Sequence, residues 1–196
     1  MQLSFRKNNT RPVLLHSREK ALDIISDCSY SVAKSLALVL IHGYRAQQWL
    51  DEGEPVEFQP DAALELAQEL ACEPNSEEFT DFFRNLEILT PQWQSRLEAG
   101  WQGGALPEQC RAMARYLIER YYLQAVSDYD LTGRVKLTVI SCLLVAGLGG
   151  DFVQTAQAYS KEIENSIDNV EAILDAAYSH FAFTDSNLLG LLRNGG

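Results

Sequence analysis

The chain has 196 residues, of which 46% are hydrophobic and 10% aromatic, and its formal net charge is −11. This composition supports a buried core and excludes an intrinsically disordered chain. The acidity is concentrated in residues 51–98, which hold thirteen acids and two bases, whereas residues 1–50 hold three acids and seven bases. Because an acidic surface repels nucleic acids and anionic membranes and attracts basic proteins, we expect a basic protein partner, no nucleic acid and no membrane.

Apolar residues recur every three to four positions in nearly every segment, which is typical of amphipathic helices. The pattern predicts an all-α fold, a bundle of about eight to ten helices. Gly43 is expected to end a helix, and residues 56–60 to form a loop or a short strand. The expected N-caps are Ser17, Asp61, Ser76, Thr90 and Asp151. The predicted helices span residues 13–25, 30–41, 44–50, 61–72, 77–89, 91–100, 107–127, 129–148, 151–165, 167–183 and 186–193.

The glycine-containing segment 100–107 is the clearest linker. It separates an expected N-terminal helical lobe, residues 1–100 with the acidic segment 51–98, from a C-terminal helical lobe, residues 107–196. A single domain is the alternative. The expected core consists of residues on the apolar stripes of the predicted helices: Leu36, Leu40, Leu64, Phe83, Leu86, Trp93, Leu117, Tyr121, Val139, Leu143, Phe152, Tyr159, Ile163, Val170, Leu174 and Phe181.

Four cysteines, Cys28, Cys72, Cys110 and Cys142, lie more than thirty residues apart. The C-x-x-C spacing of zinc and iron–sulfur sites is therefore absent, and we expect no metal in this chain. The last three cysteines are interpreted as small buried side chains in a reducing compartment. The N-terminus has no signal-peptide pattern and the longest apolar run, residues 137–148, is too short to span a bilayer. We therefore expect a soluble, cytoplasmic protein.

No catalytic or cofactor-binding residue can be assigned from the pattern. His16, His42 and His180 stand alone and are interpreted as surface or helix-end residues. Segment 147–150, rich in glycine, follows a predicted helix rather than a strand, so we interpret it as a turn and not as a nucleotide-binding loop. Lys161 could form a surface ion pair with Glu164, and Arg134 could pair with Asp128 or Asp130.

A cluster of tyrosines and arginines follows residue 114. Stacked aromatic and guanidinium groups can bind nucleobases or methylated ammonium groups. Tyrosines at helical spacing are, however, more typical of a core seam whose hydroxyls reach the rim, and we favour that interpretation. The cluster consists of Tyr116, Tyr121, Tyr122 and Tyr129 with Arg115 and Arg120.

Three segments are distinctive as strings. They read NLEILTPQW at residues 85–93, YLIERYYLQAV at 116–126 continuing as DLTGRVK at 130–136, and YSKEIENSIDN at 159–169. In this order they resemble the C-terminal half of bacterial flagellin lysine-N-methylases, over roughly residues 80–193. Asn165 stands where relatives usually have histidine, and the closely spaced cysteines of the family's N-terminal half have no counterpart here.

The resemblance implies a helical part of a protein lysine methyltransferase system. It implies S-adenosylmethionine and a metal or iron–sulfur centre on a part outside these residues, with flagellin as a partner. We expect this chain to be non-catalytic alone and to serve substrate presentation or protein interaction. The acidic segment is the expected contact, through Glu65, Glu69, Glu73, Glu77, Glu78 and Asp81.

Two other classes stay open. A helix-turn-helix transcription regulator would fit the positive charge of residues 1–50, although the segment that would read bases, residues 35–41, is apolar on all sides. A helical maturation chaperone for redox enzymes would fit the size and acidity of the chain.

Overall fold

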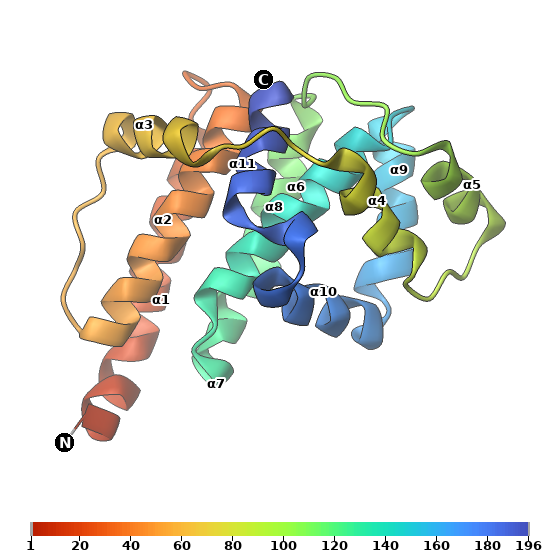
Figure 1. Cartoon of the computed structure of the whole chain (residues 1–196). Helices are drawn as coiled ribbons and strands as arrows, with labels where there is room; N and C mark the ends of the chain where they lie inside the picture. The colour runs from red at the N-terminus through yellow and green to blue at the C-terminus, as the bar shows by residue number, and fades with distance from the viewer. Residues whose placement is uncertain (1, 196) are drawn as a thin grey trace.

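The computed structural model describes residues 2–195, with side chains from residue 10 onward. All secondary structure in this part is helical (Figure 1), so the predicted all-α class is confirmed. Besides the single-turn α7, ten α-helices are present among the described residues, within the predicted range. They are α1 (Gln2–Ser26), α2 (Val32–Glu52), α3 (Pro60–Leu70), α4 (Ser76–Arg84), α5 (Pro91–Ala99), α6 (Gln109–Tyr121), α7 (Ala125–Asp128), α8 (Leu131–Gly147), α9 (Phe152–Tyr159), α10 (Ile167–Ser179) and α11 (Asp185–Asn194).

Side-chain caps fix several helix starts. Thr90 accepts a hydrogen bond from the Trp93 amide at 3.3 Å, and Asp151 accepts one from the Gln154 amide at 2.8 Å, so these two predicted N-caps are confirmed. Each cap satisfies an amide that has no partner inside its helix.

Three other predicted caps are wrong. Ser17 lies inside α1, which begins much earlier than expected, and its hydroxyl donates to the Leu14 carbonyl. Asp61 belongs to the first turn of α3, because Pro60, whose missing N–H costs nothing there, starts that helix. Asn75 rather than Ser76 caps α4.

Helix α2 is continuous where two helices were predicted. Gly43 does not end it; instead, a Cβ at Gly43 would lie 2.8 Å from Cγ2 of Val135 on α8. The missing side chain therefore serves the close approach of α2 and α8 rather than a helix stop. Residues 54–59 then form a loop without strand structure.

Two predicted single helices are interrupted. Residues 109–128 form α6, a 3-10 turn (Tyr122–Gln124) and α7, and Tyr129 ends them with a left-handed φ of 63°. Residues 152–164 form α9 followed by a π-helical turn (Ser160–Glu164), and a 3-10 turn (Phe181–Phe183) separates α10 from α11. Short 3-10 and π segments redirect side chains that a regular helix would space evenly.

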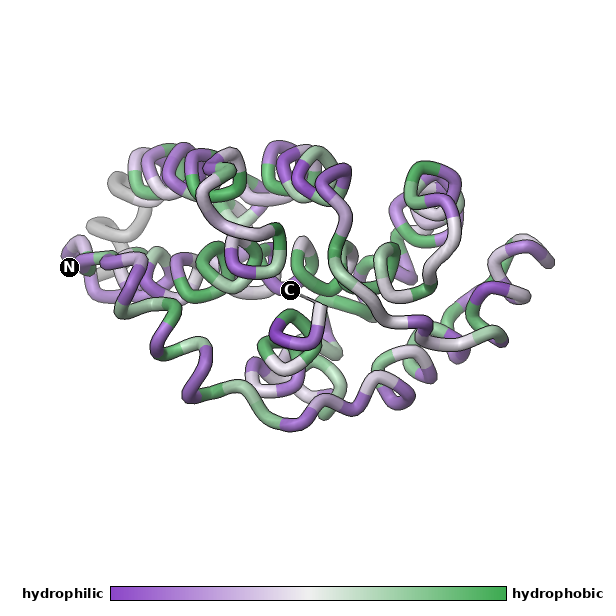
Figure 2. The backbone as a smooth tube through the Cα atoms, turned by 90° about the horizontal axis from the view of Figure 1, so that it is seen from above, coloured by the Kyte–Doolittle hydropathy of each residue, from purple (hydrophilic) through white to green (hydrophobic). Residues whose placement is uncertain are grey.

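Helix α8 is the axis of the core. Every one of its residues except Ala146 is buried, and α2, α6 and α10 pack around it. The surrounding helices alternate between hydrophilic and hydrophobic positions along their length (Figure 2), as expected for helices with one face on a core.

Most of the predicted core is confirmed. Phe181 is wrong: it is 53% exposed, because the 3-10 turn directs Phe183 inward instead. Five predicted residues are half-buried against the core: Leu64, Leu86, Phe152, Val170 and Leu174. Ten are buried: Leu36, Leu40, Phe83, Trp93, Leu117, Tyr121, Val139, Leu143, Tyr159 and Ile163.

Segment 100–107 is irregular, as expected of a linker, and is anchored at both ends. The Gln102 amide donates to the Gly147 carbonyl at 2.7 Å and the Leu106 amide to the Gly195 carbonyl at 2.9 Å. The Trp101 ring packs onto Gly147, where a Cβ would lie 2.1 Å from it. Buried residues from both sides of the linker join one hydrophobic core, and the proposed division into two lobes stays a prediction.

Candidate functional site

A groove of about 490 Å³ runs between α2 and α3. Its apolar part consists of Leu40 and Ile41 from α2 and of Leu66 and Leu70 from α3. Leu70 is 44% exposed, because α3 buries only Ala63 and Ala67 and leaves its leucines at the edge. The groove therefore offers apolar surface that no described helix covers.

The rim of this groove is acidic. Asp51 and Glu52 at the end of α2 and Asp185 at the start of α11 line it, and Arg45 is the one base among its described lining residues. Glu52 accepts hydrogen bonds from Gln48 at 3.1 Å and pairs with no cation in the described chain. Glu69 is exposed and follows Leu66 by three residues on α3, so the two are neighbours on the surface of that helix.

Asp185 is already neutralised from inside the protein. The Lys136 ammonium, on α8, lies 3.1 Å from the Asp185 carboxylate and also donates to the carbonyls of Ala177 and Phe183, at 2.8 and 3.0 Å. The Tyr44 hydroxyl donates to Asp185 at 2.8 Å, and burial followed by this negative charge raises the pKa of Tyr44. Among the acidic residues that line the groove, Glu52 therefore keeps its negative charge without a cation partner in the described chain.

The six predicted partner-binding acids fall into two groups. Glu65, Glu69 and Glu77 are exposed and make no hydrogen bond or ion pair with any residue that the structure describes. The others have partners within the protein. Glu73 lies 3.7 Å from Arg193, Glu78 accepts from the Asn75 side chain that caps α4, and Asp81 pairs with Arg84.

A second notable arrangement surrounds the π-helical turn. Glu162 is fully buried, and its carboxylate accepts hydrogen bonds from the Leu89 amide at 2.7 Å and from the Thr90 hydroxyl, just before α5. Asn169 donates to the Glu87 carbonyl at 3.0 Å and to the Glu162 carbonyl at 2.8 Å. The segments 85–93 and 159–169 are therefore joined through the side chains of the latter.

The segment 116–126 meets the same turn. Glu164 accepts hydrogen bonds from the hydroxyls of Tyr116 and Tyr121, at 3.1 and 3.2 Å, and lies 3.5 Å from the Arg120 guanidinium. That guanidinium lies over both phenol rings, with centroid distances of 5.9 and 5.4 Å. Burial raises the pKa of Tyr121 and the charge of Glu164 raises it further, which keeps the phenol protonated as a donor.

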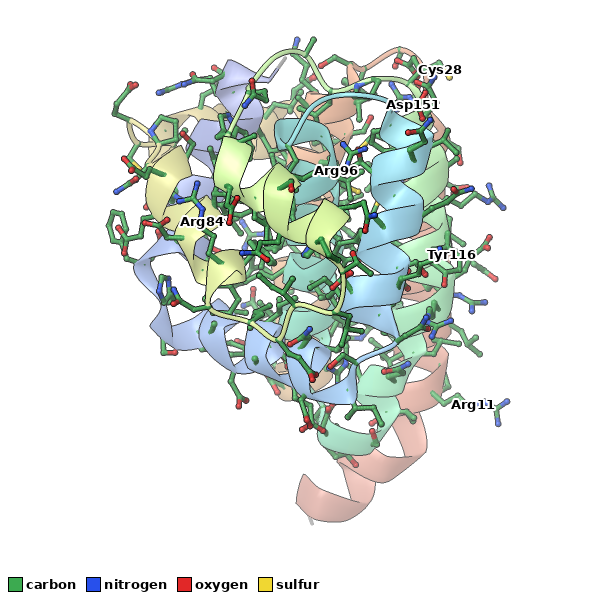
Figure 3. The ribbon with its side chains drawn as sticks, turned by 90° about the vertical axis from the view of Figure 1, so that its right-hand side faces the viewer. Arg11, Cys28, Arg84, Arg96, Tyr116 and Asp151 are labelled. Carbon is green, nitrogen blue, oxygen red and sulfur yellow. The ribbon has the colours of Figure 1, made fainter. Side chains whose placement is uncertain are left out.

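This cluster corrects two expectations. Glu164 pairs with Arg120, whereas Lys161 makes no ion pair in the described part of the chain. The core interpretation of the tyrosines holds for Tyr121 and Tyr122, which are buried. Tyr116 instead reaches the surface where α6 lies beside α9 (Figure 3). The aromatic and acidic groups thus hold the chain's own guanidinium.

The histidines do not all lie where the sequence suggested. His16 is exposed and His180 ends α10, as predicted. His42 is wrong as a surface or helix-end residue: it is 7% exposed, because α2 continues past Gly43 and turns His42 toward α1. Because the helix was predicted to end at Gly43, His42 was predicted to be a helix-end residue rather than a buried one.

The residues present do not fit the metal or methyl-donor sites of the family resemblance. Among the described residues, no three His, Cys, Asp or Glu side chains gather as metal ligands. Cys110 and Cys142 are buried as predicted, whereas Cys72 is half-buried and Cys28 exposed. The glycine segment after α8 is a turn, as predicted, and the Asp151 carboxylate caps the helix that follows by accepting a hydrogen bond from the Gln154 amide.

Two further structural findings bear on other classes of protein. Residues 35–43 of α2, which include the segment that a helix-turn-helix protein would use to read bases, are all buried. No helix in residues 2–195 combines the length and apolar character needed to cross a bilayer.

Arg134 pairs with Asp128, one of its two predicted partners, at the start of α8.

Comparison with known proteins adds no relative. No protein-family model, no curated protein and no solved structure matches this chain. The features that bear on function are therefore the groove, the π-helical turn and the segments that carry the family resemblance.

The sequence missed the apolar half of the groove. Leu66, Leu70 and Glu52 are not among the residues predicted to form the core or to bind a partner. A signal was present: Leu66 and Leu70 are four residues apart and form their own stripe, beside the alanine stripe that the core uses.

Proposed function

We propose that this protein is a non-catalytic, protein-binding helical module that holds a lysine-bearing segment of a basic partner in the groove between α2 and α3. The observation that carries the proposal is an uncovered apolar floor, Leu66 and Leu70, beside the unpaired carboxylate of Glu52. Two exposed carboxylates without counter-charges, Glu65 and Glu69, lie on the same helix as these leucines. A lysine side chain has the matching chemistry, because its aliphatic stem can lie on leucine while its ammonium stays at an acidic rim.

We further propose that the module serves a protein lysine-methylation system of the flagellin lysine-N-methylase kind, with flagellin as the partner presented. The support is that the three segments that carry the resemblance are in contact in the fold: Glu162 and Asn169 hold segment 85–93, and Glu164 holds segment 116–126. Under this proposal S-adenosylmethionine and the metal or iron–sulfur centre belong to a part outside residues 1–196.

The groove can be tested with a synthetic peptide that alternates lysine and leucine, compared with the same peptide in which glutamine replaces lysine. The variant Glu65→Lys/Glu69→Lys reverses two unpaired charges one turn apart on α3. We expect the variant to bind the lysine peptide about tenfold more weakly at low salt, measured by fluorescence anisotropy, because exposed charges act additively and are screened by salt.

The matched control is Glu171→Lys/Asp175→Lys, which reverses two exposed charges with the same spacing on α10. The control should bind the peptide as the parent does. Equal weakening in both variants, or binding that is indifferent to lysine in the peptide, would contradict a site in the groove.

The methylation proposal has separate tests. The parent protein should retain purified flagellin, and the variant Glu65→Lys/Glu69→Lys should not. If the parent binds the lysine peptide but does not retain flagellin, flagellin is excluded as the partner while the groove remains a peptide-binding site. Incubation with labelled S-adenosylmethionine and flagellin should give no labelled lysine above background. Labelling would overturn the non-catalytic assignment.

A further inference from the structure

A second cavity, of about 370 Å³, lies between α1, α2 and the loop that joins α2 to α3. Its chemistry is opposite to that of the groove. His16 and Lys20, one turn apart on α1, and Arg45 on α2 line it, and no carboxylate does so among the described side chains. In a protein with a net charge of −11 this is a concentration of positive charge, which we call the basic pocket.

The cations of the basic pocket are not used by the fold. Lys20 and Arg45 are exposed, and neither forms an ion pair or a hydrogen bond with a residue in the described part of the chain. Cations in a concave site with low-dielectric walls attract anions more strongly than the same cations on a flat surface. The pocket therefore presents two free cations to an incoming anion.

His42 lines the pocket, and one of its ring nitrogens is hydrogen-bonded while the other has no partner. Its Nε2 is 2.9 Å from the Ser17 carbonyl, which can only accept, so Nε2 carries the proton and Nδ1 is an acceptor in the neutral ring. Nδ1 is buried and has no hydrogen-bond partner. Burial, and then the charges of Lys20 and His16, lower the pKa of His42 and keep the ring neutral. A buried acceptor without a donor is unfavourable, which indicates that a donor belongs there.

Aromatic rings form the remaining walls. The Trp49 ring meets the His16 ring edge-on, with 5.6 Å between centroids, and the Phe58 ring meets the His42 ring edge-on at 5.2 Å. Phe58 belongs to the loop after α2, whose residues 54–58 make no backbone–backbone hydrogen bond within the described chain. The ring that contacts His42 is thus carried by a loop that no backbone–backbone hydrogen bond holds in the described chain.

We propose that the basic pocket binds a small aromatic carboxylate that carries a hydroxyl or N–H donor. The carboxylate pairs with Lys20 and Arg45, the ring lies between Trp49 and Phe58, and the donor reaches Nδ1 of His42. The volume is in the range of small-molecule sites, about 300–1,000 Å³, and the few polar groups among apolar walls are typical of them. This proposal does not rest on partner binding in the groove or on the methylation proposal, although Arg45 lines both cavities.

The test uses indole-3-acetate as the probe and tryptophol, which has the same ring and N–H without the negative charge, as its neutral counterpart. Binding is followed by the indole N–H signals of the three tryptophans in ¹H–¹⁵N NMR spectra, with Trp49 assigned from Trp49→Phe. We expect a saturable shift of the Trp49 signal with indole-3-acetate, little change in Trp93 and Trp101, and binding of tryptophol weaker by about tenfold or more.

The variant Lys20→Gln/Arg45→Gln should bind indole-3-acetate about tenfold more weakly and tryptophol as before, since only the charge contact is lost. Arg11→Gln/Lys34→Gln is the matched control: it removes the same charge from exposed residues outside the pocket, and Arg11 points into solvent (Figure 3). Lys20→Gln alone serves if the double variant is unstable.

No saturable Trp49 shift at millimolar indole-3-acetate overturns the proposal, and so does equal weakening in the control or equal binding of the two compounds. The outcome can be distinguished from that of the groove experiment. Arg45 lines both cavities, where it attracts the carboxylate in the basic pocket and repels lysine in the groove. Its loss should weaken indole-3-acetate but not the lysine peptide.

Discussion

Helices α8 and α3 show two ways of attaching a helix to the same protein. Helix α8 is buried on all sides, leaving only Ala146 partly exposed, whereas α3 buries Ala63 and Ala67 alone. A helix surrounded by others must satisfy every polar group that it carries, since an unpaired buried group is costly. A helix held by one stripe of small residues is free to present leucines and carboxylates to a partner.

The polar residues of the two helices follow this difference. In α8 the Lys136 ammonium has three oxygen partners, and the Ser141 hydroxyl lies 2.6 Å from the hydroxyl of Tyr159. In α3 the carboxylates of Glu65 and Glu69 have no described partner. Lys136 and Ser141 in α8 are therefore committed to the fold, whereas Glu65 and Glu69 in α3 are available for interaction.

The sharpest test of this contrast is one chemical change made in both helices. Leu143→Ala removes a side chain that is 1% exposed in α8 and should lower the free energy of unfolding by about 3–4 kcal/mol. Leu70→Ala makes the same change at a residue that is 44% exposed and should cost about 1 kcal/mol or less. Urea denaturation measures both, and similar losses would show that α3 is packed as tightly as α8.

The buried ammonium gives the next largest effect. Lys136→Met keeps the length of the side chain but leaves two carbonyls and the Asp185 carboxylate without their donor. We expect a loss of about 2 kcal/mol, because Asp185 is partly exposed and water screens part of the deficit. Lys161→Met, at an exposed residue, is the control and should stay within about 0.5 kcal/mol of the parent. A Lys136 variant as stable as its control would contradict a structural role.

His42 on α2 gives the smallest effect, and one that depends on pH. Its pKa in the folded protein lies below the ordinary value of 6.5, so below pH 6.5 the unfolded chain takes up a proton that the folded chain refuses. Stability is therefore complete above that pH and falls as the pH decreases through the folded pKa, by at most about 1.4 kcal/mol per pH unit.

Urea denaturation between about pH 7.5 and 5 measures this dependence. His42→Asn should flatten the slope relative to the parent. A slope that survives His42→Asn would assign the pH dependence to another group.

The fold class and most of the core follow from local periodicity, and so were predictable. Thr90 and Asp151 cap their helices with contacts three residues away, which a sequence displays directly. The prediction for Gly43 is wrong because the glycine is required by a contact with another helix, where Val135 lies too close for any side chain at residue 43. Local chemistry predicts a helix end there, and only the tertiary contact explains why the helix continues.

The cavities were harder to predict for the same reason. The basic pocket requires His16 and Lys20 on α1 to face His42 and Arg45 on α2, and this pairing depends on an uninterrupted α2. The acidic segment was visible as composition, yet composition does not distinguish Glu69, which is free, from Asp81, which pairs with Arg84. The sequence shows how many charged residues a segment contains, whereas the fold decides which of them are free to bind a partner.

The irregular segments 54–58 and 100–107 should respond very differently to limited proteolysis. Segment 100–107 looks flexible by composition but is fastened to the ends of α8 and α11 by its own amides, and Trp101 packs onto α8. Residues 54–58 have no comparable backbone anchors within the described chain. A protease should therefore cut first between α2 and α3. That single cut would break the loop that lines the basic pocket and sever the connection between the two helices that form the groove. It should weaken both sites, while the core around α8 survives as a nicked but folded protein.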